Sequence, residues 1–177
     1  MLTGIQIAVI GGDARQLEVI QKLSELDAAI SLVGFDSLQN EFSGAVKKSF
    51  TPELLTNVDA VILPVVGTDD EGKVQTVFSS ENIMLQEEHF LAIPKQAKIY
   101  TGMATGYLKR LSRSTGAHIV ELLELDDVAI YNSIPTAEGA LMLAIENTDI
   151  TIHGAKCMVA VSKKEKLKQT VIFPAKG

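Results

Sequence analysis

Two patterns of apolar and polar residues alternate along the chain: short continuous apolar runs, and longer segments in which apolar residues recur at regular intervals. Short runs rich in Val, Ile and Ala indicate strands that are buried on both faces, because neither face of such a run is polar. The segments between them carry apolar residues at intervals of three and four, the spacing of a helix with one buried face. We predict strands at Ile5–Ile10, Ala29–Phe35, Ala60–Val66, Lys98–Thr101 and Ala117–Leu122, and helices at Ala14–Leu26, Leu85–Leu91 and Thr105–Ser114.

This alternation of strands and helices predicts the fold class. Short connections from strand to helix to strand favour right-handed crossovers and a parallel sheet. We therefore expect an α/β domain with a doubly wound, mostly parallel sheet of about five strands, similar to flavodoxin or Rossmann folds. Ala45-Val46 could add one short strand.

A helix of a different kind follows the last predicted strand. Pro135 suits a first helical turn, so we predict a linker helix from there to Asn147, with Glu138 in its first turn. Nearly every face of this helix is apolar, which is typical of a helix packed between two layers. The expected division is an α/β domain over 1–150, including the linker helix, and a remnant strand with a basic tail over 151–177.

Composition narrows the class of protein. The chain has 177 residues, of which 46% are hydrophobic and 21% charged, and this suits one globular domain with a sizeable core. The net charge of −6 disfavours nucleic acid as a partner. No apolar run reaches the length of a bilayer span and the amino terminus lacks the features of a signal peptide, so we expect a cytoplasmic protein. The single cysteine, Cys157, lies in an apolar run over Cys157–Val161 that we predict to be a buried strand.

Parallel sheets bind ligands at the carboxyl ends of their strands, where three predicted loops converge. The first loop contains Gly11-Gly12, Asp13 and Arg15 and does not match the GxGxxG fingerprint. Two glycines suit either a tight strand-to-helix turn or the close approach of a small anion to the start of a helix. Arg15 is either a solvated surface residue or a planar group that binds a carboxylate through two parallel hydrogen bonds.

The other two loops also offer groups that could bind an acid. The second contains Thr68 and Lys73 as contacts, together with three adjacent acidic residues that lack the spacing of a calcium loop and are best explained as solvated. The third resembles the backbone loop by which the substrate domains of 2-hydroxyacid dehydrogenases hold a carboxylate. It consists of Gly102, Met103, Ala104 and Thr105.

The sequence does not support metal or nucleophile chemistry. No spacing matches a zinc site, a serine nucleophile elbow or a cysteine–histidine pair. His89 lies on a polar predicted helix and His118 at the start of a strand, so we expect both at the surface or at an edge. His153 is expected to be a hydrogen-bonded turn residue, with proton transfer as the alternative.

Three stretches carry a resemblance to a known family. IAVIGGDARQLEVIQKL (7–23), DDVAIYNSIPTAEGALMLAI (126–145) and NTDITIHGAKCMVAV (147–161) resemble the amino-terminal part of the A subunit of dipicolinate synthase, a family of spore-forming bacteria. In that family a GLGRTG-type fingerprint and an NADP-binding domain come next. Here no glycine follows the resemblance before Gly177, so we expect the nucleotide-binding half to be missing and NADP not to bind tightly to this chain.

The resemblance implies a reaction and a set of site residues. The complete protein would oxidise a dihydro- or tetrahydrodipicolinate-type precursor to dipicolinate, with NADP and a second, flavoprotein-like subunit, in the mother cell of a sporulating bacterium. This chain would be the substrate-side domain, inactive by itself, that binds a small dicarboxylate. Arg15, Lys73 and the amides of Gly102–Thr105 would then anchor carboxylates, and Asn132 and Glu138 would orient substrate or nicotinamide. No residue is identified as the general base.

The rival interpretation is a non-catalytic module, a flavodoxin-like domain that binds a small acid or docks a partner subunit. The apolar linker helix, if exposed, would promote self-association, so we also expect a homo-oligomer.

Overall fold

The computed structural model describes residues 1–157. These residues form two compact units, one over Met1–Glu124 and a second that begins at Leu125. The first unit contains the sheet and the second contains the long helix. The division falls before that helix, whereas the sequence analysis placed the helix with the sheet in 1–150, a boundary that stays a prediction.

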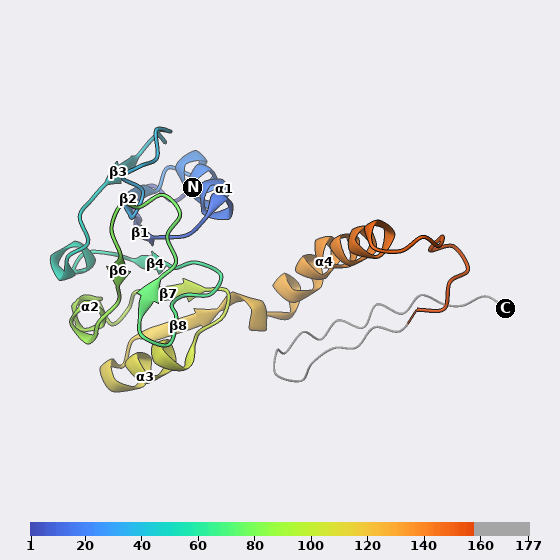
Figure 1. The fold of residues 1–177 in the computed structure, drawn as a ribbon. Coiled ribbons are helices and arrows are strands. Elements are labelled where there is room, and N and C mark those ends of the chain that lie inside the picture. Colours follow the sequence, from blue (N-terminus) through green and yellow to red (C-terminus); the bar gives the residue numbers. More distant parts are fainter. Residues whose placement is uncertain (158–177) are drawn as a thin grey trace. The chain divides into compact units, whose positions relative to one another are not determined.

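A six-stranded sheet with every neighbouring pair parallel forms the centre of the first unit (Figure 1). It confirms the predicted fold class, an α/β sheet with helices on its faces. The expected number of strands was one too small, because the possible short strand at Ala45-Val46 does pair with its neighbour. In spatial order the strands are β3 (Ala45–Lys47), β2 (Ala29–Val33), β1 (Gln6–Ile10), β4 (Ala60–Ile62), β7 (Lys98–Thr101) and β8 (His118–Glu121).

Two apolar clusters lie on opposite faces of this sheet, since successive side chains of a strand point to opposite faces. Ile7 and Val9 of β1 belong to one cluster with Ile20 of α1. Ala8, between them, belongs to the other cluster with Leu108 of α3. The helices and 3₁₀ turns of this unit are α1 (Ala14–Glu25), η1 (Pro52–Leu55), α2 (Glu87–Ala92), α3 (Gly106–Thr115) and η2 (Leu122–Glu124).

The strand order reverses at β1, and this reversal decides where a ligand can bind. From β1 the chain runs to β2 on one side and later returns to β4 on the other side. In such sheets a crevice opens outside the carboxyl ends of the strands at the reversal. Between β4 and α2 the chain also forms a small antiparallel hairpin of β5 (Lys73–Val74) and β6 (Ile83–Met84).

The long helix α4 spans Asp126–Glu146, so the predicted start near Pro135 was wrong. Pro135 lies inside the helix, where its ring removes one backbone hydrogen bond. Two hydroxyls beside it donate to carbonyls of the preceding turn: Ser133 Oγ to Ile130 O at 2.6 Å and Thr136 Oγ1 to Asn132 O at 2.8 Å. These residues are therefore not N-caps, and Glu138 is a mid-helix residue rather than a first-turn one.

None of the residues of α4 is buried, although the sequence analysis expected a helix packed between two layers. Its exposed large side chains include Tyr131 and Ile145, at 75% and 62% of their full area. By length and composition alone α4 is also long and apolar enough to cross a bilayer, contrary to the expectation that no segment would be. That property does not establish a membrane span, because core helices of globular proteins share it.

The predicted strand Cys157–Val161 is not supported at its one described residue, Cys157. Cys157, expected to be buried in that strand, is exposed and has no regular secondary structure. The remainder of the predicted strand, 158–161, and the basic tail lie outside the described residues.

Candidate functional site

The Gly11-Gly12 turn after β1 is approached by the chain itself. Gly12 N donates to Gln75 O at 2.7 Å, and Val77 N donates back to Gly12 O at 3.1 Å. A Cβ on Gly11 would lie 2.7 Å from both Gln75 O and Val74 Cγ1. The two glycines thus admit a neighbouring backbone into the position where a dinucleotide fold places a pyrophosphate.

Residues 75–80, which we call the strap, continue from this turn to the end of β2. Ser37 N donates to Phe78 O at 3.0 Å, and the Phe78 ring stacks on Phe35 with centroids 6.0 Å apart. At the end of the strap, Asp36 Oδ2 accepts hydrogen bonds from Ser80 N at 2.9 Å and from Ser80 Oγ at 2.5 Å. The Ser80 hydroxyl, followed by its backbone amide, lowers the pKa of Asp36 from 3.8 to about 2.

The start of α1 is also occupied by a group of the same chain. Asp13 is the N-cap, and its Oδ1 accepts from Arg15 N at 2.9 Å. The Arg15 guanidinium grips the same carboxylate, with Nε 3.0 Å from Oδ1 and Nη2 2.6 Å from Oδ2. This hydrogen bond lowers the pKa of Asp13 and raises that of Arg15. Arg15 therefore holds a carboxylate through a planar fork, as the sequence analysis considered, but the carboxylate is that of Asp13.

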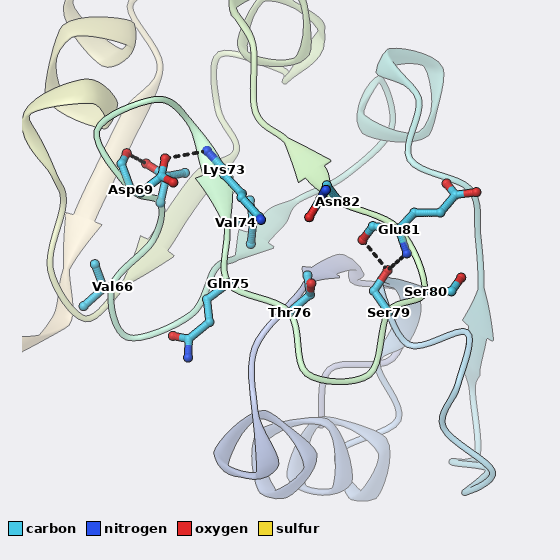
Figure 2. A pocket seen from close by; sticks show the side chains of 11 residues that line it. Val66, Asp69, Lys73, Val74, Gln75, Thr76, Ser79, Ser80, Glu81 and Asn82 are labelled. Atoms are coloured by element: carbon cyan, nitrogen blue, oxygen red, sulfur yellow. Dashed lines mark hydrogen bonds between the residues drawn. The ribbon is translucent and has the colours of Figure 1, made fainter.

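An open hollow of about 620 Å³ lies beside the filled turn (Figure 2). In Figure 2, Asp69 and Lys73 lie on one side of this space, and Ser79 and Glu81 lie on the other. Its volume falls in the range of small-molecule pockets. The hollow is lined by Val66, Thr68, Asp69, Lys73, Val74, Gln75, Thr76, Ser79, Ser80, Glu81 and Asn82.

Two of the predicted contacts, Thr68 and Lys73, meet in this lining. Thr68 is buried, and its hydroxyl lies 3.1 Å from that of Thr105, the N-cap of α3, so it ties two of the predicted loops together. Lys73 is exposed, and no described carboxylate forms an ion pair with its ammonium. The hollow thus holds one cation, Lys73, together with neutral hydrogen-bonding groups and the carboxylates of Asp69 and Glu81.

Asp69, the first of the three acids in this loop, accepts hydrogen bonds from its own loop. Asp69 Oδ1 accepts from Glu71 N and from Lys73 N, each at 2.9 Å. The Lys73 amide is the largest cause of the lowered pKa of Asp69, so this carboxyl group is ionised and engaged at neutral pH. Asp69 therefore shapes a turn, and the described residues contain no group of acids, histidines or cysteines that could hold a metal.

The loop Gly102–Thr105 has fewer available amides than the sequence analysis expected. Met103 N donates to Val65 O at 2.7 Å. Ala104 N donates to Glu121 Oε2 at 2.9 Å, and Glu121 also forms an ion pair with Lys109. At least these two amides are already used within the fold, one of them by a carboxylate. The role of this loop as a substrate anchor stays a prediction.

The histidines and the two residues of the linker helix complete the comparison with the predicted site. His89 is buried rather than at the surface; its Nδ1 accepts from Gln86 N and its ring stacks on Phe50 at 4.2 Å. Burial lowers the pKa of His89, so the ring is a neutral structural group. Asn132 and Glu138 are exposed on α4 in the second unit, and their roles stay predictions.

Comparison with known proteins identifies the family. The family model for the N-terminal domain of the dipicolinate synthase A subunit matches residues 6–123. The A subunit of dipicolinate synthase from Bacillus subtilis (strain 168) is 50% identical over 159 residues, which are 90% of this chain and 54% of that protein. The chain belongs to the family of dipicolinate synthase A subunits.

Solved structures agree with this assignment. The crystal structure of the dipicolinate synthase A subunit from Bacillus halodurans gives a TM-score of 0.80 at 51% identity, over 87% of this chain and 53% of that one. The crystal structure of its counterpart from Bacillus subtilis gives a TM-score of 0.83 at 51% identity, over 87% and 52%. The chain thus spans about half the length of the dipicolinate synthase A subunits it matches.

Sequence reasoning missed the strap and with it one wall of the hollow. Ser79, Ser80, Glu81 and Asn82 carry no motif, and the backbone bonds that place them have no signature in side chains. One signal was present: Asp36 follows β2, the position at which Rossmann folds place an acid on the cofactor ribose. Here the strap serine takes the place of that ribose as the donor to Asp36.

Proposed function

We propose that this chain supplies the substrate side of a dipicolinate synthase A subunit. The reaction would be the oxidation of a dihydro- or tetrahydrodipicolinate-type precursor to dipicolinate, during sporulation, in the cytoplasm of the mother cell. The nicotinamide of NADP would accept the hydride, held by a domain other than the first unit, and a second, flavoprotein-like subunit would take part. Membership of the family supports this proposal, and the hollow beside β5 is the proposed binding site for the dicarboxylate.

The hollow can hold a small acid. Lys73 supplies one cation, and the hydroxyl of Thr76 and the side-chain amides of Gln75 and Asn82 supply neutral donors. The hydroxyls of Ser79 and Ser80 already donate within the chain. Hydrogen bonds between a cation and a carboxylate are about twice as strong as neutral ones.

Asp69 Oδ1 accepts hydrogen bonds from two amides of its own loop, which reduces its repulsion of an acidic ligand. The Glu81 carboxylate also lines the hollow and opposes such a ligand, so Lys73 has to outweigh it.

The single observation that carries the proposal is the contrast at the Gly11-Gly12 turn. The amide of Gly12 that would face a pyrophosphate is already bonded to Gln75, while the neighbouring hollow is open. A unit of this kind can hold an acid and leaves the dinucleotide to another domain. We therefore expect no tight binding of NADP to the first unit.

Calorimetric titration of dipicolinate into the chain tests the site. Lys73→Ala should weaken binding by about 1.5–3 kcal/mol, or roughly tenfold to a hundredfold. Lys95→Ala removes the same charge from an exposed position before the amino end of β7 and should leave the affinity unchanged. Arg15→Ala should change it no more than about fivefold, because its guanidinium already binds Asp13 and is exposed.

Two outcomes would contradict the proposed site. Absence of dipicolinate binding by the unaltered chain would remove the proposed function of this unit. A larger loss in Arg15→Ala than in Lys73→Ala would move the anion to the start of α1, and Asp13 would then have to release the guanidinium.

The exposed apolar side chains of α4 support a second proposal, that this chain associates with a copy of itself or with another subunit. A large exposed apolar surface is unusual for a monomer. Light scattering at increasing concentration should show a rising mean mass, and a constant monomer mass would contradict self-association.

A further inference from the structure

The strap ends in a wall that is hollow on both sides. Ser79, Ser80, Glu81 and Asn82 line the proposed substrate hollow, and they also line a second hollow of about 570 Å³ near the ends of β2 and β3. Ser80, Glu81 and Asn82 are exposed, so packing contributes little to holding them in place. Their position therefore depends on the hydrogen bonds of the wall and on β6, which follows Asn82 and pairs with β5.

Those hydrogen bonds are unevenly distributed. The start of the strap is fixed by two backbone bonds to Gly12, and its middle by Phe78 through Ser37 and Phe35. Beyond Phe78 a local turn binds the wall to itself: Ser79 Oγ donates to Glu81 O, and Glu81 N donates to Ser79 Oγ. For Ser79–Glu81, the described hydrogen bonds to other parts of the chain come from one carboxylate, Asp36, in the loop after β2 and 44 residues from Ser80 in sequence.

We infer that Asp36 is a positioning residue for the substrate hollow: its carboxylate locks Ser80 and so sets the wall formed by Ser79–Asn82. This inference rests on the proposed function, because the wall matters only if the hollow binds the dicarboxylate. Asp36 itself lines the second hollow and not the first. It therefore acts on the substrate through Ser80 and not by contact.

The consequence is an order of events for ligand binding. When Ser80 is bonded to Asp36, the side-chain donors of Thr76 and Asn82 lie in the lining of the hollow together with Lys73. When the hydrogen bonds between Ser80 and Asp36 are broken, the wall samples other positions, and the fraction of molecules that can bind the ligand falls. The apparent affinity then falls by that fraction, with no contact to the ligand removed.

The test combines hydrogen exchange with calorimetry, with dipicolinate as the probe. Asp36→Ala should raise amide exchange in residues 79–82 and weaken dipicolinate binding about tenfold, which corresponds to loss of about 1.4 kcal/mol. Asp36→Asn keeps an oxygen that can accept from Ser80 N, so it should restore part of both. Asp59→Ala is the matched control, since Asp59 Oδ2 also accepts a backbone amide, Gln6 N at 2.8 Å, but at the amino edge of the sheet.

The possible results separate the inference from the proposed function. Binding by the unaltered chain with unchanged affinity in Asp36→Ala would overturn the inference alone. Unchanged exchange in residues 79–82 would also overturn it, because the lock would then not exist. Equal losses of affinity in Asp36→Ala and Asp59→Ala would assign the effect to general destabilisation. No binding by the unaltered chain would overturn the proposed function and the inference with it.

Discussion

The turn after β1 and the hollow beside β5 lie at the same carboxyl edge of one sheet. The turn is occupied by the chain's own backbone, whereas the hollow is open. At the turn, glycines without side chains admit the strap, and Gly12 is bonded on both its N–H and its carbonyl. At the hollow, the exposed Lys73 and the side chains of Gln75, Thr76 and Asn82 line open space. The crevice that such a fold offers to a dinucleotide is filled by the chain's own backbone, and the proposed acid site lies beside it.

The difference teaches how a Rossmann-like order of strands can be kept without its usual ligand. The glycines after β1 and the acid after β2 are both present, but their partners are Gln75, Val77 and Ser80. A sequence pattern that normally indicates a cofactor here indicates a strap. The contrast between the turn and the hollow exists because the strap fits against the two glycines, and single substitutions can disrupt that fit.

Gly11→Ala should have the largest effect. The residue has a φ of 64°, and an added Cβ would lie 2.7 Å from Gln75 O, so the strap backbone would have to move. Overpacking and left-handed strain together should cost roughly 2–4 kcal/mol in the free energy of unfolding. Gly116→Ala is the matched control, because its φ is 76° but nothing lies within 4 Å of the added Cβ. It should lose only about 1 kcal/mol in denaturant unfolding, and equal losses in the two variants would show that the strap does not press on Gly11.

The sheet could be predicted from sequence because its signal is local. Runs such as Ile7–Ile10 are buried on both faces, and the run is recognisable by itself because every position in it is apolar. The edge strand β3 was only a possibility, since Val46 is exposed and a three-residue strand has little pattern.

The strap and the linker helix could not be predicted for two different physical reasons. The strap is held by bonds between residues more than forty positions apart, and most of these bonds join backbone groups, which leave no trace in side-chain type. The helix was started too late because Pro135 is a common first-turn residue, whereas here Ser133 and Thr136 supply hydroxyl bonds beside an interior proline. Lys73 could be singled out because a lone cation after a polar turn is a local feature, and its role as a substrate contact stays a prediction.

A smaller effect concerns the pH at which the strap is released. The pKa of Asp36 is lowered from 3.8 to about 2, so the ionised carboxylate favours the locked strap above pH 4 and this contribution disappears as the pH falls towards 2. In a carbon NMR titration of the Asp36 carboxyl group we expect a midpoint near the lowered value. Ser80→Ala should move that midpoint back towards 3.8, because the Ser80 hydroxyl is the largest cause of the shift.

Asp69 provides the control for this titration. Its pKa is also lowered, but by the amides of Lys73, Glu71 and Gly72, none of which Ser80→Ala removes. The Asp69 midpoint should therefore stay where it is in both proteins. An Asp36 midpoint that does not respond to Ser80→Ala would contradict the proposed lock.

The most direct test of the central claim is to add dipicolinate and NADPH separately to the isotopically labelled 177-residue chain and record its amide NMR spectrum. The claim is that the first unit binds a small dicarboxylate beside β5 and is closed to a dinucleotide at the turn after β1. Dipicolinate should shift the amides of Lys73, Thr76 and Ser79–Asn82, and NADPH should leave those of Gly11 and Gly12 unchanged. Shifts at Gly11, Gly12 and Asp36 on addition of NADPH, with no response to dipicolinate around Lys73, would contradict it.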